Sequence, residues 1–198
     1  MRYPEHLLKL IEVLKKFPGV GNKSAERFAF HLLNWSEDQL KEMGTVLSTV
    51  KENLHHCSLC GCLMDHHGCQ FCDTSRRRCD TLCIISSPRD VFAIEGTHEF
   101  KGLYHVLKGL LSPMNHRGPE FLNLDSLKNR ITTFNIKEII IALDSTLEGD
   151  ATSLYLKQEL SSLPVSISRL AFGIPMGSSI DYVDGGTLAR ALSARSKY

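Results

Sequence analysis

The 198-residue chain has no long apolar run and almost no net charge. No stretch approaches the roughly 18–20 consecutive apolar residues that a membrane span needs. The first residues lead into an amphipathic segment and not into the unbroken apolar run of a secretory signal, so the sequence predicts a cytoplasmic protein. A net charge of +1 argues against a protein that coats nucleic acid with its whole surface, and any phosphate contact must come from local positive clusters.

The chain does contain enough apolar material to build real cores. Hydrophobic residues make up 42% of it, which argues against wholesale disorder, and the length suggests one or two compact units without an internal repeat. Residues 5–16 show helical periodicity, and a Pro- and Gly-containing break separates them from a second helix. Ser36 and Gln39 form a capping-box pattern that starts a third helix. Its apolar positions are Leu40, Met43, Leu47, Val50 and Leu54.

The pattern changes after about residue 80. Leu82–Ile85 and Glu138–Leu143 are short apolar runs of the kind found in buried parallel strands. Helix-like stretches lie between and after them, and the segment 87–90 (SPRD) reads as a helix start. Strands that alternate with helices predict an α/β domain. The last stretch, from about Gly173, is rich in Gly and Ser and shows few periodic cues.

The most specific local pattern is a group of four cysteines in two Cys-x2-Cys pairs. Without a secretory signal, clustered thiols bind metal or carry out redox chemistry more often than they form disulfides. Each pair can present two thiolates from one tight turn, and two such turns complete a tetrahedral Zn²⁺ site with no open position. We therefore predict one structural zinc ion per chain. Its predicted ligands are Cys57, Cys60, Cys69 and Cys72.

Other interpretations of these cysteines stay open. They could be unrelated core residues, or one pair could be a redox motif, although neither pair opens a thioredoxin-like βαβ unit. Cys83 lies inside an apolar strand and is expected in the core. The neighbouring histidines are expected to be solvated, although one could replace a thiolate. The remaining candidate ligands are Cys62, Cys79, His55, His56, His66 and His67.

A glycine-containing hairpin joins the first two predicted helices, and its segment FPGVGNKSA resembles the h-x-G-h-G turn of helix-hairpin-helix motifs. Gly19 and Gly21 let the backbone turn sharply and approach a phosphate, while the start of the next helix offers free N–H groups. Lys23 and Arg27, four residues apart, add charge on one helix face. We expect sequence-independent DNA binding here. The alternative is an ordinary turn with two solvated basic residues.

Acidic residues follow the second apolar strand, in a segment (DSTLEGD) that resembles the Toprim motif D-x-D-x-x-G-E of topoisomerases and primases. Asp144, Glu148 and Asp150 could hold Mg²⁺ weakly through oxygen atoms, or could be acids favoured at a helix start. Ser86 stands where this superfamily carries a glutamate, and Thr146 replaces the second aspartate. Phosphoryl transfer in this fold needs those carboxylates. We therefore predict no catalytic residues and no enzymatic activity, and the departures disfavour Mg²⁺ binding.

Taken in order, these motifs resemble the RecR family, the recombination mediators of the bacterial RecFOR pathway. The resemblance covers essentially the whole chain, including the strings STLEGDAT, RLAFGIP and YVDGGTL, although Ser178 and Ser179 replace a usual glycine pair. It implies a multi-domain α/β protein in four parts. These are a helix-hairpin-helix DNA-binding domain over residues 1–55, a four-cysteine zinc finger over 56–79, a Toprim domain over 80–174, and a C-terminal segment over 175–198 that contacts other subunits.

The resemblance also implies a function. The chain would bind DNA in repair, assemble into a ring-like tetramer or a dimer, and act with RecO, and in many bacteria RecF, to load RecA onto DNA covered by single-strand-binding protein. It would be associated with the nucleoid. By motif position the hairpin residues Gly19, Gly21, Lys23 and Arg27 would contact DNA, and the acids Asp144, Glu148 and Asp150 would form a partner-docking surface. A ring suits the small net charge, because several linked weak contacts gain avidity.

Two other functions compete with this one. A Toprim-type Mg²⁺-dependent nuclease, primase or topoisomerase would need the acidic set, and Ser86 and Thr146 count against it. A zinc-stabilised protein-interaction module without DNA contact would keep its DNA retention unchanged when Lys23 and Arg27 are replaced by alanine.

Overall fold

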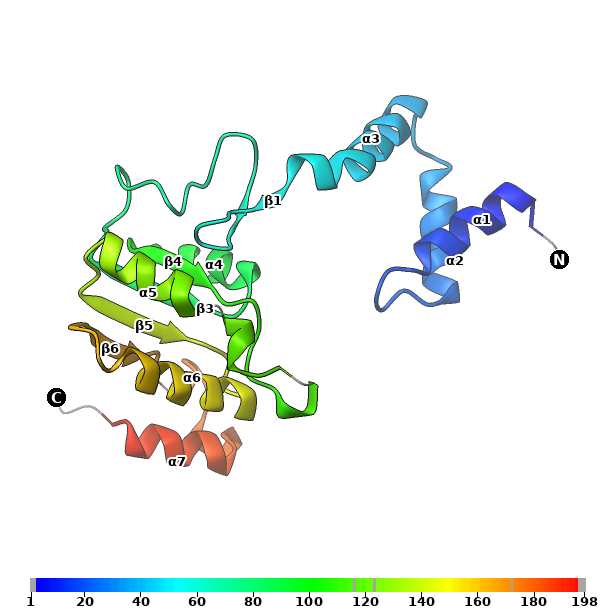
Figure 1. Cartoon of the computed structure of the whole chain (residues 1–198). Coiled ribbons are helices and arrows are strands. Elements are labelled where there is room, and N and C mark those ends of the chain that lie inside the picture. Colours follow the sequence, from blue (N-terminus) through cyan, green and yellow to red (C-terminus); the bar gives the residue numbers. More distant parts are fainter. Residues whose placement is uncertain (1–2, 116, 123, 172, 196–198) are drawn as a thin grey trace. The chain divides into compact units, whose positions relative to one another are not determined.

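The structure, a computed structural model, describes residues 3–115, 117–122, 124–171 and 173–195. The chain divides into two compact units, Met1–Leu54 and His55–Tyr198 (Figure 1). None of the helices in the described ranges has the length and apolar character that a transbilayer segment needs.

The first unit contains the helices α1 (Glu5–Leu14), α2 (Asn22–Leu32) and α3 (Glu37–Asn53). Its small core forms where α1 meets α2: Ile11 and Leu14 pack against Ala25 and Ala29, which have no exposed surface. Small side chains on α2 let the two helices approach closely, so the glycine hairpin between them is held at both ends.

α3 begins at the predicted capping box, which is confirmed. The Ser36 N–H donates to Gln39 Oε1 at 2.9 Å, and the Gln39 N–H donates to Ser36 Oγ at 3.3 Å. Within the described chain α3 buries none of its residues. Its predicted apolar stripe is real but has no partner here, since Leu47 is 54% exposed and Val50 is 43% exposed.

The second unit is built on a parallel sheet in the order β4-β3-β5-β6. The strands are β3 (Thr81–Ile85), β4 (Leu103–Val106), β5 (Glu138–Ala142) and β6 (Ser166–Arg169). The two strands expected from sequence are therefore confirmed to within one residue. β4 and β6 were not expected, because LYHV and SISR interrupt the apolar pattern with polar side chains.

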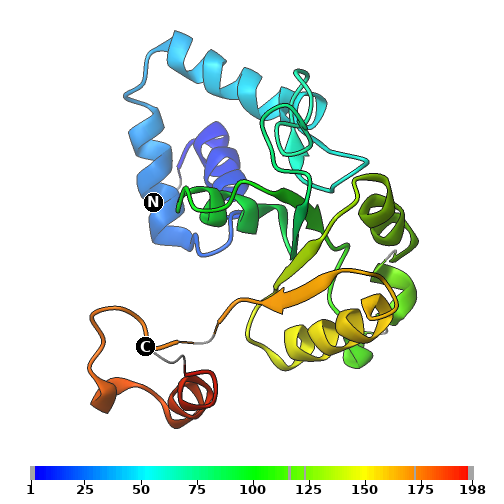
Figure 2. The ribbon, with the colours of Figure 1, turned by 90° about the vertical axis from the view of Figure 1, so that its left-hand side faces the viewer.

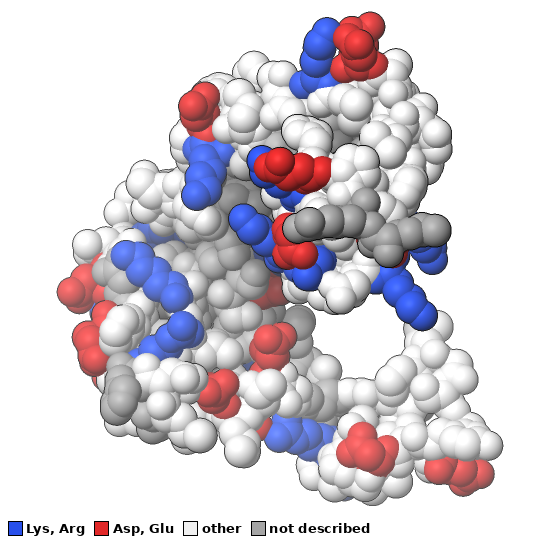
Figure 3. Space-filling view, turned by 90° about the vertical axis from the view of Figure 1, so that its right-hand side faces the viewer, with Lys and Arg blue, Asp and Glu red and all other residues white. Residues whose placement is uncertain are grey.

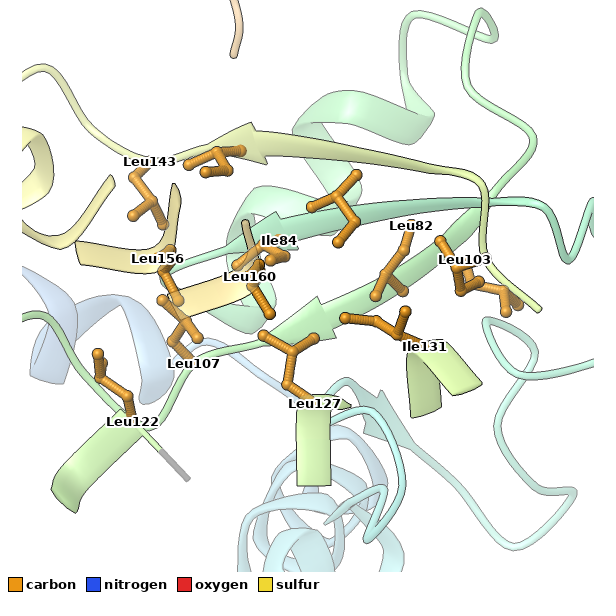
Figure 4. Packing of buried hydrophobic residues seen from close by; sticks show 13 residues of the cluster. Leu82, Ile84, Leu103, Leu107, Leu122, Leu127, Ile131, Leu143, Leu156 and Leu160 are labelled. Carbon is orange, nitrogen blue, oxygen red and sulfur yellow. The ribbon is translucent and has the colours of Figure 1, made fainter. Parts of the chain in front are cut away.

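Helices cover both faces of this sheet. They are α4 (Pro88–Glu95), α5 (Leu124–Thr133) and α6 (Leu147–Leu160), with two short 3-10 turns at Pro113–Asn115 and Pro119–Leu122. Figures 1 and 2 show α5 and α6 on one face and α4 on the other. The main core lies under α5 and α6, where Leu127 and Leu156 meet strand residues such as Leu82 and Ile84 (Figure 4). α4 begins at the expected Ser87 cap, with Pro88 in its first turn.

The other face of the sheet packs against the cysteine-rich module. This module opens with a short hairpin of β1 (His55–His56) and β2 (Leu63–Met64), which pair antiparallel. Its Phe71 is 2% exposed and meets the Tyr104 ring edge-on at a centroid distance of 5.7 Å. The module thus shares a hydrophobic core with β3, β4 and α4.

The C-terminal segment contains a helix that its composition did not indicate. After a 3-10 turn at Ile180–Tyr182, α7 spans Gly185–Ser193. Asp184 caps this helix, because its Oδ1 accepts from the Thr187 N–H at 3.0 Å. The Arg190 guanidinium then donates to Asp150 Oδ2 at 2.7 Å, which links α7 to the start of α6.

Candidate functional site

The structure brings the four spaced cysteines together. The Sγ atoms of Cys57, Cys60, Cys69 and Cys72 all lie within 4.8 Å of one another. The Cys60 and Cys69 sulfurs are 3.4 Å apart, and the Cys57 and Cys72 sulfurs are 3.9 Å apart. A tetrahedral Zn²⁺ ion with Zn–S bonds of about 2.3 Å would place its sulfur ligands roughly 3.8 Å apart. The four thiols therefore fit a zinc ion, and no position is left open for substrate or water.

A tight backbone turn presents the first cysteine pair. The Cys57 N–H donates to the Cys62 carbonyl at 2.8 Å, and the Gly61 N–H donates back to the Cys57 carbonyl at 2.8 Å. Gly61 has a φ of +77°, and a Cβ there would lie 2.9 Å from the Val106 Cβ. Only glycine allows this turn to sit directly against β4. The Val106 N–H completes the contact by donating to the Cys60 carbonyl at 2.8 Å.

The thiols influence one another strongly. Hydrogen bonds from Cys62, Cys69 and Cys72 lower the pKa of Cys60 below its ordinary value. The bond to Cys60 raises the pKa of Cys69 to about 11 and also raises the pKa of Cys72. Without a cation, four thiolates this close would repel one another. A bound Zn²⁺ supplies the positive charge that lets all four ionise.

The other cysteines and the histidines lie outside the four-thiol cluster. Burial raises the pKa of Cys83 to about 12, as expected for an inert thiol in the sheet core. Cys62 is completely buried beside Cys60, and Cys79 donates to the Arg77 carbonyl at 3.7 Å. The four candidate histidines are exposed: His55, His56, His66 and His67.

One charged residue next to the cluster was not found from the sequence. Arg130, on α5, is 3% exposed, and its Nη2 donates to Cys72 Sγ at 3.8 Å. Its Nη1 lies 3.4 Å from Nδ1 of His105, and burial followed by the Arg130 charge lowers the pKa of His105 to about 4. The sequence could have indicated this residue. Arg130 shares a helix face with the apolar residues at 127, 131 and 134, and a charged residue is unusual on such a face.

The hairpin between α1 and α2 is open around its glycines and at the start of α2. Gly19 has a φ of +79°, and no atom lies within 4 Å of the Cβ position at Gly19 or Gly21, so space above the turn is open. α2 has no side-chain cap at Gly21, which leaves its first N–H groups free of such a bond. Lys23 and Arg27 are both exposed on α2. Over the face in Figure 3, basic and acidic side chains are interspersed.

The Toprim-like acids do not converge on a common point. Asp150 accepts from Arg169 at 2.6 Å and from Arg190 at 2.7 Å, while Glu148 accepts from the Ser112 hydroxyl at 2.5 Å. Asp144 is exposed. Ser86, at the place of the usual glutamate, donates to Asp90 at 3.0 Å. Within the described residues the four-cysteine cluster is the only group of His, Cys, Asp or Glu side chains placed to hold a metal.

Comparisons with known proteins cover most of the chain. Family models match at residues 7–51 (RecR, helix-hairpin-helix), 80–171 (Toprim domain) and 173–196 (RecR, C-terminal). Recombination protein RecR of Protochlamydia amoebophila is 62% identical over 198 residues, with both chains fully covered. The proteins of the same name from Chlamydia pneumoniae and Chlamydia caviae are 51% and 50% identical over 199 and 200 residues, with all of this chain and at least 99% of each relative covered.

Proposed function

Because this chain belongs to the RecR family of recombination proteins, we propose that it is a non-enzymatic recombination mediator that binds DNA and partner proteins. It would act with RecO, and with RecF where present, to load RecA onto DNA covered by single-strand-binding protein. The observation that carries the proposal is the end-to-end likeness to RecR, which includes hairpin, Toprim domain and C-terminal segment alike. We also propose that the chain has four parts, with boundaries at residues 55/56, 79/80 and 174/175.

DNA contact is assigned to the hairpin and the start of α2. The open space at Gly19 and Gly21 admits a phosphate, and the uncapped helix start offers N–H groups to it. Lys23 and Arg27 are exposed one helical turn apart on that helix, so they can add charge-assisted contacts. Such contacts go to the DNA backbone and carry no base information, so binding would not depend on sequence.

Replacing Lys23 and Arg27 together by alanine tests this assignment. We expect the affinity for a gapped DNA at low salt to fall at least about tenfold, because two charge-assisted contacts are lost. The slope of log affinity against log salt should become shallower by about one per phosphate contact. Fluorescence anisotropy with labelled DNA measures both quantities, and circular dichroism checks that the fold is intact.

A matched control removes two cations from the same unit. Lys9 and Lys41 are exposed but already paired with Glu5 at 2.6 Å and Glu37 at 3.6 Å. Their double alanine variant should bind DNA within about threefold of the unaltered protein. Unchanged binding by the Lys23 and Arg27 variant would favour a protein-interaction module instead.

We propose that the Toprim domain is not catalytic, because acidic side chains of its site are replaced or already paired. Ser86 offers a hydroxyl where a glutamate would move the proton, and that hydroxyl is engaged with Asp90. Asp150 is neutralised by two arginines, so it is a poor ligand for Mg²⁺. We assign Asp144 and Glu148, which are exposed, to partner docking. Cleavage of the same gapped DNA in Mg²⁺, abolished by Asp144→Ala, would contradict the proposal.

The four thiols are assigned to one structural zinc ion per chain. Bound zinc would hold the two turns of the cysteine module together, and its binding energy would contribute to folding of this module. Because all four positions of the tetrahedron are taken by protein, the ion would have no place for a reacting group.

A further inference from the structure

The charge of a zinc–tetrathiolate centre has to be balanced inside the second unit. Four thiolates and one Zn²⁺ leave two net negative charges, and Cys57 and Cys60 are only 8% and 1% exposed. Buried charge without a compensating partner is strongly unfavourable. We propose that the Arg130 guanidinium is the buried counter-charge of this centre and positions Cys72 in it. The inference rests on zinc occupying the four-cysteine site.

Arg130 is held in place beside the four-cysteine cluster. It is 3% exposed on α5, and its Nη2 donates to Cys72 Sγ at 3.8 Å. Its Nη1 donates to the Tyr104 carbonyl at 2.6 Å, which holds the guanidinium in one orientation. Its ring contact with Phe134, at 5.9 Å to the centroid, fixes the side chain further. The group is therefore aimed at a thiolate by contacts on two sides.

In the part of the chain that the structure describes, no acidic side chain pairs with Arg130. Other partly buried arginines have carboxylate partners, since Arg77 pairs with Glu95 and Arg169 with Asp150, both at 2.6 Å. Among the described residues no Asp or Glu oxygen lies within 4.0 Å of the Arg130 nitrogens. His105 offers a ring nitrogen but no negative charge. The thiolates are the anions that make a buried guanidinium here favourable.

The two cysteine pairs are attached to the sheet in different ways. Strand β4 is an edge of the sheet, and its Val106 N–H bonds to the Cys60 carbonyl at 2.8 Å. The backbone thus ties the first pair to β4. Arg130 bridges the Tyr104 carbonyl of the same strand to Cys72 of the second pair. Both cysteine pairs are therefore attached to the same strand. The second pair is attached through the side chain of Arg130, which lies 58 residues from Cys72 in the sequence.

Zinc retention in the full-length protein tests the inference. Arg130→Met keeps most of the apolar volume but removes the charge, and zinc release to excess chromogenic chelator is followed by absorbance. Loss of an outer partner of a metal ligand typically weakens metal binding about 10–100-fold, so we expect retention of zinc to fall by that factor. Arg130→Lys, which keeps a charge but loses the bidentate fork, should recover part of it.

Arg77→Met is the matched control. Arg77 is also a partly buried arginine that bonds to the sheet edge, at the Gly102 carbonyl, and stacks on Phe71 and Tyr104, but its anion is Glu95. It should release zinc at the rate of the unaltered protein even if it lowers stability. Equal rates of zinc release from the unaltered protein, Arg130→Met and Arg77→Met would overturn the role of Arg130. Equally accelerated release from the two methionine variants would overturn it as well.

A spectroscopic measurement covers the case in which Arg130→Met does not fold. In the Co²⁺-loaded Arg130→Lys protein we expect the thiolate-to-metal charge-transfer band to shift. A single ammonium cannot bridge the Tyr104 carbonyl and the Cys72 sulfur as the guanidinium does, so the hydrogen bond to that sulfur changes. The Co²⁺-loaded Arg77→Met protein should keep the original band. Identical bands would contradict the inference. A purified unaltered protein without zinc would instead overturn the metal assignment itself, which total-metal analysis decides separately.

Discussion

Gly149 shows how a single residue of the Toprim-like segment is constrained by packing and not by chemistry. It lies in the first turn of α6, and a Cβ there would come within 2.1 Å of the Asp144 carbonyl oxygen. That oxygen belongs to the loop leaving β5, so the loop can close onto the helix start only if no side chain intervenes. The glycine is thus required even though the neighbouring acids do not form a metal site.

Gly149→Ala should therefore destabilise the second unit. We expect a loss of at least about 1–3 kcal/mol in the free energy of unfolding, as for other overpacked sites, because loop and helix must separate to make room. Urea denaturation followed by circular dichroism measures it. Gly185→Ala is the control, since nothing lies within 4 Å of its Cβ position, and it should change stability by less than about 0.5 kcal/mol. Equal stability of the two variants would show that the close approach is absent.

At the scale of elements, the C-terminal helix is attached through one carboxylate. Asp150, on α6, accepts from Arg190 of α7 and also from Arg169 at the end of β6. Hydrogen bonds from Arg169 and Arg190 lower the pKa of Asp150 below its ordinary value. The two ion pairs of Asp150 therefore contribute fully to stability above the ordinary aspartate pKa of about 3.9. This contribution is lost as the pH falls through the lower pKa that Asp150 has in the folded protein.

Arg190→Met should loosen α7 without unfolding the sheet. We expect the amides of α7 to be less protected against hydrogen exchange, relative to their intrinsic exchange rates, at neutral pH. The same loss of protection is expected in the unaltered protein as the pH is lowered below about 4. Arg195→Met is the control, because its guanidinium donates to the Leu192 carbonyl of its own segment and not to α6. Exchange in α7 that is the same in both variants would mean that the ion pair does not hold the helix.

Each of the two units of the molecule leaves apolar surface that its own described residues do not cover. The stripe on α3 is the clearest case, and the C-terminal segment adds Ile180, Tyr182 and Leu192, which are 62%, 91% and 60% exposed. Exposed apolar surface of this kind marks contacts with other proteins. The ring-like tetramer or dimer implied by the RecR resemblance would bury it against further copies of the chain.

Leu47→Asp with Val50→Asp should therefore lower the solution mass. We expect a dimer or tetramer for the unaltered protein by light scattering and a smaller species for the variant, since two charges would have to be buried in the contact. Glu42→Ser with Lys51→Ser changes two polar residues of the same helix and should leave the mass unchanged. A strict monomer for the unaltered protein would contradict self-association and remove the avidity argument for DNA binding.

Much of this organisation was predictable because it depends on local chemistry. The capping box at Ser36, the cap at Ser87 and the two apolar strands are set by residues a few positions apart, and all appear where expected. The edge strand β4 was missed for the opposite reason, because its polar residues are accommodated by partners distant in sequence. The helix α7 was missed because two glycines near its start disguise it.

The sequence by itself determined the spacing of the four cysteines, and two closely spaced pairs favour one small tetrahedral ion without an open position. It likewise determined the loss of the catalytic pattern, since no fold can restore a carboxylate at Ser86. Only the tertiary structure decided what surrounds the thiolates. Arg130 and Cys72 come together because α5 and the cysteine module pack beside the same strand, and no local pattern encodes that meeting.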